Sequence, residues 1–218
     1  MNLSRPDSSL LSKPLEASLA ILPVAYLPPL DHFAAMLAHD EVKWDTHEFF
    51  HKQYYYNRCV IYGPNGEQKL TIPVHKKFEK TPIKDILIGY ETPWQKIHWR
   101  SFEAAYRRSP YFEYYEGSFY PLYWEHTPKY LVEWNIKILE VILGLMKIEL
   151  KPSYTNEYIK SYEGARDYRN LIIPNEKTNL KEMKYHQVFE ERHGFIPNLS
   201  IIDLLFCEGP HAKEYLHS

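Results

Sequence analysis

The pattern of hydrophobic positions changes along the chain, from short apolar runs to helical stripes. The run Leu19–Leu22 stops at Pro23 and predicts a buried strand. Asp31 follows a proline-rich turn and can cap a helix that ends near Ala38. Residues 42–46 predict a second strand, so we expect the chain to open strand, helix, strand.

A β-hairpin is the clearest local prediction. Two strand-like segments, 58–62 and 69–74, flank a loop from Gly63 to Gln68. In that loop Asn65-Gly66 supplies the positive φ angles that tight turns require. Residues 83–88 predict a further strand, which ends at Gly89.

Helical periodicity dominates the second half of the chain. Pro93 precedes one helical stripe, and a longer stripe predicts a helix over about residues 128–147 that buries Trp134. Residues 185–189 predict a strand. Ser200 starts a Ser-x-x-Asp pattern typical of a helix N-terminus, and Gly209-Pro210 ends that helix.

We therefore expect the α/β class, with a strand–helix–strand opening, a β-hairpin and a mainly helical second half. The 218 residues contain no internal repeat and no linker-like segment, which indicates a single domain. We place that domain at residues 18–218. Prolines interrupt the polar N-terminal segment, so residues 1–17 are expected to form a flexible tail.

The composition of the chain argues against several classes of binding partner. The formal net charge is −2, so no overall positive charge attracts the chain to nucleic acid. No apolar run approaches the roughly 18–20 residues that cross a bilayer, and we expect no membrane insertion. Cys59 and Cys207 form no C-x-x-C motif and indicate reduced thiols in a cytoplasmic protein.

The motifs of common cofactors and metals are missing as well. With 8 glycines, the sequence contains neither G-x-G-x-x-G nor a P-loop, and it indicates no cofactor. His47 and His51 have the spacing of two metal ligands on a helix, but Glu48 does not complete H-E-x-x-H. We therefore predict no metal site.

Two clusters of polar residues are candidates for one anion-binding site. Lys52, Asn57 and Arg58 bracket the start of a predicted strand, where lysine and arginine can meet an anionic group. Solvated charges at a strand end are the alternative.

The second cluster lies on the helix predicted after Pro93. Lys96 and Arg100 are four residues apart, so their like charges repel unless an anion or nearby acids compensate. His98 lies between them and is the candidate catalytic acid or base near neutral pH. A partly buried structural histidine is the alternative.

Several blocks of the sequence, taken together and in order, resemble the WbqC-like protein family. The resemblance covers roughly residues 20–216 and rests on Ala25-Tyr26-Leu27-Pro28-Pro29, Lys52 with Tyr56-Asn57-Arg58, Leu70-Thr71-Ile72-Pro73-Val74, Trp94-Gln95-Lys96-Ile97-His98-Trp99, Tyr111-Phe112-Glu113-Tyr114-Tyr115 and Asn198 to Phe206. The family commonly opens Gln-Pro-x-Tyr-Leu-Pro, and this chain lacks that glutamine. We add Tyr26, from the first block, to the candidate substrate-binding residues.

The resemblance implies a function in surface-polysaccharide biosynthesis. Some WbqC-like proteins are encoded in O-antigen gene clusters, and transfer of glycine to a surface sugar has been proposed for such a member. This implies an acyl- or aminoacyl-type transferase with a small anionic partner, either a nucleotide sugar or an acyl or aminoacyl donor. In that scheme the cations hold a phosphate or carboxylate, and His98 deprotonates the acceptor.

Two other functions fit the sequence. The turn that ends at His32 faintly resembles the H-x-G-H turn of nucleotidylyl transferases, which would make the chain another nucleotide-using α/β transferase. Alternatively, the tyrosine-rich segment 106–124 serves a non-catalytic module that binds glycans or proteins. The sequence does not indicate an oligomeric state.

Overall fold

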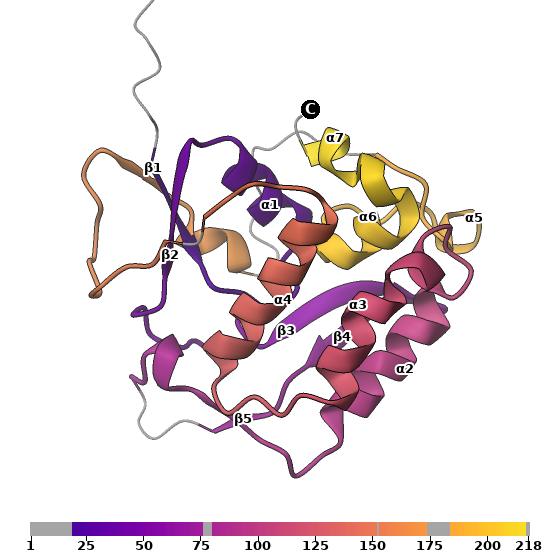
Figure 1. Cartoon of the computed structure of the whole chain (residues 1–218), viewed down its shortest axis with the longest axis horizontal. Helices are drawn as coiled ribbons and strands as arrows, with labels where there is room; N and C mark the ends of the chain where they lie inside the picture. Colours follow the sequence, from indigo (N-terminus) through magenta and orange to yellow (C-terminus); the bar gives the residue numbers. More distant parts are fainter. Residues whose placement is uncertain (1–18, 76–79, 152, 174–183, 217–218) are drawn as a thin grey trace, which may run out of the picture.

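The computed structural model describes residues 19–75, 80–151, 153–173 and 184–216 (Figure 1). Its strands are β1 (Leu19–Pro23), β2 (Glu41–Asp45), β3 (Arg58–Gly63), β4 (Gly66–Thr71), β5 (Val74–His75), β6 (Leu87–Ile88) and β7 (Ala165–Asp167). Its α-helices are α1 (Leu30–Leu37), α2 (Trp94–Tyr106), α3 (Phe112–Trp124), α4 (Leu131–Leu145), α5 (Glu190–His193), α6 (Ile201–Glu208) and α7 (Ala212–Leu216). The tail predicted at residues 1–17 lies outside the described residues.

Three short strands form a parallel sheet in the order β2–β1–β7. β1 pairs with β2 as far as Pro23↔Asp45 and with β7 as far as Ile21↔Asp167. The predicted strand–helix–strand opening is confirmed, because α1 connects β1 to β2. Since all three strands run in one direction, their carboxyl ends meet at one edge of the sheet.

The predicted hairpin is confirmed, but its turn is tighter than expected. β3 and β4 pair from Arg58↔Thr71 to Gly63↔Gly66, which leaves Pro64 and Asn65 as the turn. Gly66 has a φ of +99°, a region that glycine enters without steric cost. The polar start of β4 gave no strand signal because its residues alternate between half-buried and exposed.

The helices pack against the hairpin and against one another. In Figure 1 the parallel sheet lies on one side of the molecule, α2 and α3 lie side by side on the other, and the hairpin and α4 lie between them. The predicted helix around Trp134 is confirmed as α4, and Trp134 is fully buried. The α/β class and the mainly helical second half are therefore confirmed.

Three other local predictions differ from the structure in whole or in part. Residues 83–88 form a 3-10 turn, Ile83–Asp85, before the two-residue strand β6. Residues 185–189 are irregular, because the Gln187 side chain bonds both backbone groups of Ile196 and takes the place of a neighbouring strand. The predicted helix after Ser200 is confirmed as α6 and ends at Gly209, but the Ser200 hydroxyl donates to the Leu27 carbonyl and does not cap the helix.

Buried residues from the sheet, the hairpin and the helices form one hydrophobic cluster. Cys59 and Cys207 are both buried and unbonded to each other, as expected of small apolar side chains. Within the described ranges, no helix combines the length and the apolar character needed to cross a bilayer.

Candidate functional site

A tight turn follows β2 at the carboxyl edge of the parallel sheet. Asp45, the last residue of β2, is fully buried. Its Oδ1 accepts the backbone N–H groups of His47 and Glu48 at 2.9 and 3.1 Å, together with the Thr155 hydroxyl at 3.0 Å. Asp45 therefore fixes the chain direction that brings Glu48 to the sheet edge.

Glu48 is a buried carboxyl group with incomplete hydrogen bonding. The side chain is 7% exposed and hydrogen-bonds to the Tyr56 hydroxyl. Its Oε1 atom has no partner among the described residues. Burial, opposed by the Tyr56 hydrogen bond, raises the pKa of Glu48 to about 8. A carboxyl group in this state can take or give a proton near neutral pH.

Arg169 connects three segments beside Glu48. Its guanidinium bonds Asp45 Oδ2 at 3.0 Å and Asp167 at 2.5–3.1 Å, and it donates to the carbonyls of Ile159 and Lys160. These contacts use all five donors of the guanidinium. Arg169 therefore holds the ends of β2 and β7 and the loop before β7 together, and has no donor left for a ligand.

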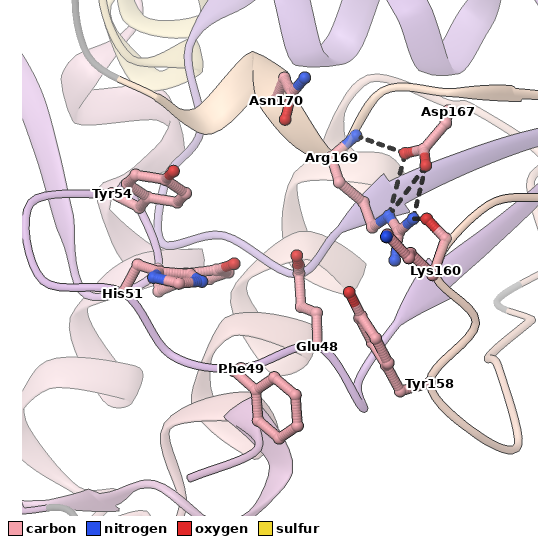
Figure 2. Close-up of a pocket in the computed structure, with 10 residues that line it drawn as sticks. Glu48, Phe49, His51, Tyr54, Tyr158, Lys160, Asp167, Arg169 and Asn170 are labelled. Carbon is pink, nitrogen blue, oxygen red and sulfur yellow. Dashed lines mark hydrogen bonds and ion pairs between the residues drawn. The ribbon is translucent and has the colours of Figure 1, made fainter. Parts of the chain in front are cut away.

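These groups open into a cavity of about 390 Å³. Its walls are mostly aromatic and polar, and they consist of Glu48, Phe49, His51, Tyr54, Tyr56, Tyr158, Lys160, Asp167, Arg169 and Asn170. Figure 2 shows the Glu48 carboxyl in the middle, with His51 and Tyr54 on one side and Tyr158 and Arg169 on the other. Ligands of open α/β sheets bind at this kind of position, outside the carboxyl ends of the strands.

His98 lies elsewhere, inside the core. The side chain is 2% exposed, and burial lowers its pKa to about 4. Its Nε2 donates to the Thr71 carbonyl at 3.3 Å, so its Nδ1 must accept from the Tyr26 hydroxyl at 2.9 Å. Tyr26 is fully buried and in turn accepts from Tyr123 at 2.7 Å. Neither predicted residue lines the cavity.

The other predicted residues also lie outside the walls of this cavity. Lys96 and Arg100 are exposed on α2, on the face opposite the buried His98. Lys52 is exposed in the loop before β3. Asn57 is buried, and its Nδ2 donates to the Ile72 carbonyl at 2.7 Å.

Arg58 is half-buried at the start of β3, and its Nε has no partner among the described residues. The structure thus separates His98 from the cations of its own helix. The anion site expected from both clusters remains a prediction.

Three other histidines considered in the sequence analysis also have defined places. His32 is buried in α1, and its Nε2 donates to the Pro23 carbonyl at 2.9 Å. His51 lines the cavity, whereas His47 contacts threonine hydroxyls. Within the described ranges, no three His, Cys, Asp or Glu side chains are grouped as metal ligands.

Sequence reasoning missed Asp45, Asp167 and Arg169, and it did not predict a functional role for Glu48. A usable signal existed for Asp45, since acidic residues at the ends of parallel strands often face a ligand site. Asp167 and Arg169 gave no such signal, because β7 is only three residues long and partly exposed.

Comparisons with known proteins agree with the residue blocks identified above. The model of the WbqC-like protein family matches residues 24–175 and 155–215. The chain is also 28% identical over 226 residues to "Uncharacterized protein Rv1507c" of Mycobacterium tuberculosis (strain ATCC 25618 / H37Rv), covering 90% of this chain and 96% of that protein. No solved structure matches this chain. The chain belongs to the WbqC-like protein family.

Proposed function

We propose that this protein is a transferase that moves an acyl or aminoacyl group onto an amine or hydroxyl of a sugar, in surface-polysaccharide biosynthesis. The chemistry is assigned to the cavity at the sheet edge. The polysaccharide context rests on the gene-cluster association of some family members.

The observation that carries the proposal is the buried Glu48 carboxyl. Glu48 lines the cavity, and its buried Oε1 has no partner among the described residues; an unsatisfied buried acceptor is costly unless a ligand donates to it. An acceptor N–H or O–H supplies that donor. With a pKa of about 8, Glu48 is partly ionised near neutral pH and strong enough as a base to remove the proton.

The transfer step follows from this placement. Ionised Glu48 takes a proton from the acceptor amine or hydroxyl, and the freed electron pair attacks the carbonyl carbon of an activated acyl or aminoacyl ester. A C–N or C–O bond forms as the bond to the leaving group breaks, and the leaving group departs with the bonding electrons. Glu48 then returns its proton to the leaving group.

The walls of the sheet-edge cavity suit a sugar that carries a phosphate or another anionic group. Tyr54 and Tyr56 stack with ring centroids 5.8 Å apart, and Phe49 packs against Tyr158 at 5.3 Å. Aromatic faces of this kind bind the C–H surfaces of sugars. Lys160 is exposed at the cavity, and no described residue pairs with its ammonium group, so it can meet a phosphate.

A transfer assay tests the proposal. The protein is incubated with acetyl and glycyl thioesters and a nucleotide-linked hexosamine, and the product is detected by its added mass. Glu48→Gln should lower kcat by about 10²-fold or more, while Glu149→Gln, at an exposed glutamate that does not line the cavity, should not. Equal rates in the two variants would contradict the role of Glu48.

The predicted anion site is a second, separable part of the proposal. If Lys52, Arg58, Lys96 and Arg100 bind one anion, inorganic phosphate should raise Tm, and Arg58→Ala and Lys96→Ala should each abolish the rise. If phosphate still raises Tm in both variants, it binds to other residues.

A glycan-binding module is the alternative function favoured by a specific observation, the aromatic cavity walls. Saturable binding of the hexosamine by the wild-type protein, with no product from any donor, would favour the module over the transferase.

A further inference from the structure

A second cavity lies away from the sheet edge, where α2 ends. It has a volume of about 460 Å³, and its walls come from the loop between α2 and α3, the segment 186–189, α5 and α6. In Figure 1 α5 lies on the side of the molecule opposite β1 and β2. The two cavities share no lining residue.

Two arginines at this cavity have no partner among the residues that the structure describes. Arg108 and Arg192 are exposed lining residues, and no described residue hydrogen-bonds or ion-pairs with either guanidinium. The neighbouring Arg107 differs, since it bonds Glu103 at 2.8 Å and Glu116 at 2.9 Å. The lining includes one acidic side chain, Glu191. His186 is also in the lining, and its Nδ1 lies 3.6 Å from Oε2 of Glu190. The positive charges of Arg108 and Arg192 therefore remain available to a ligand.

The remaining wall is largely apolar. It includes Pro110, Val188 and Phe189, with the Cys207 side chain only 6% exposed. Burial raises the pKa of the Cys207 thiol well above its usual range, so the sulfur stays protonated and behaves as part of an apolar surface.

We propose that this cavity is a second ligand site, and that its ligand carries a phosphate or carboxylate head on an apolar body. Guanidinium groups match both oxyanions through paired hydrogen bonds. The apolar wall gains free energy when a hydrocarbon portion displaces water from it. A ligand of this kind therefore uses both halves of the cavity.

Binding can be measured with three simple probes: hexyl phosphate, hexanoate and inorganic phosphate. At ten times its dissociation constant, a bound probe should raise Tm by about 3–5 °C. Comparing hexyl phosphate with hexanoate identifies the preferred head group.

The arginines are tested by the double change Arg108→Gln and Arg192→Gln. It should weaken binding at least about tenfold and reduce the rise in Tm accordingly. Arg166→Gln changes an exposed arginine outside the cavity and should leave binding intact. Glu48→Gln should also have no effect, which separates this site from the proposed transferase site.

Three results would overturn the proposal. The first is that no probe shifts Tm at millimolar concentration. The second is that the shift survives the double arginine change. The third is that inorganic phosphate binds as tightly as hexyl phosphate, because the apolar wall would then contribute nothing.

Discussion

Glu48 couples the chemistry of the sheet-edge cavity to the stability of the fold. Its folded-state pKa of about 8 lies above the unfolded value of about 4.5, so folding takes up a proton between these pH values. The free energy of unfolding should therefore fall as pH rises through this window. The same group must lose its proton to act as a base, so the two properties change in opposite directions.

Glu48→Gln isolates this effect. The variant lacks the titration, so its stability relative to the wild type should rise between about pH 4.5 and pH 8, with a maximum slope of about 1.4 kcal/mol per pH unit. Urea denaturation at several pH values measures the difference. A constant difference across this window would mean that Glu48 titrates normally in the folded protein.

His98 shows the opposite linkage. Its folded pKa of about 4 lies below the unfolded 6.5, so its contribution to stability is complete above about pH 6.5 and is lost as pH falls toward 4. His98→Gln should cost about 1–3 kcal/mol at neutral pH by leaving buried groups unpaired, and the cost should shrink in acid. Transfer activity per folded molecule should be unchanged, and a large loss of kcat at intact stability would instead make His98 catalytic.

At the scale of elements, the apolar stripe of α4 determines which face of the helix is buried, and Trp134 lies on that face. Trp134 packs edge-on against Trp94 and Tyr123, at centroid distances of 5.6 and 5.3 Å, and its buried indole N–H has no partner within the described ranges. Trp134→Ala should therefore cost about 3–5 kcal/mol. Trp134→Phe should cost much less, because it keeps a ring and removes the unpaired N–H. Chemical denaturation compares the two, and equal costs would contradict this packing.

The elements that could be predicted from the sequence are those in which apolar residues recur with the period of a helix or a strand. α2, α4 and the hairpin bury one face, so their periodicity is visible in the sequence. β6 and β7 have two and three residues, too few to show alternation, and depend on backbone pairing with a distant strand. Residues 185–189 looked like a strand because their pattern does not reveal that a glutamine side chain replaces the neighbour.

At the scale of the whole molecule, the cavity depends on segments more than a hundred residues apart. Residues 45–56 come from the end of β2, and residues 158–170 come from around β7. The two meet because β1 pairs with both strands and because Arg169 bridges their ends. The resemblance to the family was visible in the sequence, but this juxtaposition was not, and the catalytic prediction fell on a histidine that the fold buries.

Arg169 is the contact that holds this juxtaposition together. The side chain is 10% exposed and pairs with Asp45, which is fully buried. Arg169→Gln should leave that carboxylate uncompensated and lower stability by about 3–5 kcal/mol. Arg166→Gln, at the exposed arginine of β7, should change it by less than about 0.5 kcal/mol. Thermal unfolding distinguishes these outcomes, and a mild effect at Arg169 would show that the sheet edge does not depend on it.

The central claim is that the sheet-edge cavity binds the acceptor through Glu48. Calorimetric titration of a nucleotide-linked hexosamine into the wild-type protein, Glu48→Gln and Glu149→Gln measures this most directly. We expect saturable binding to the wild type and to Glu149→Gln, and binding at least about tenfold weaker to Glu48→Gln. Equal affinity for all three proteins, or no binding to any of them, would contradict the claim.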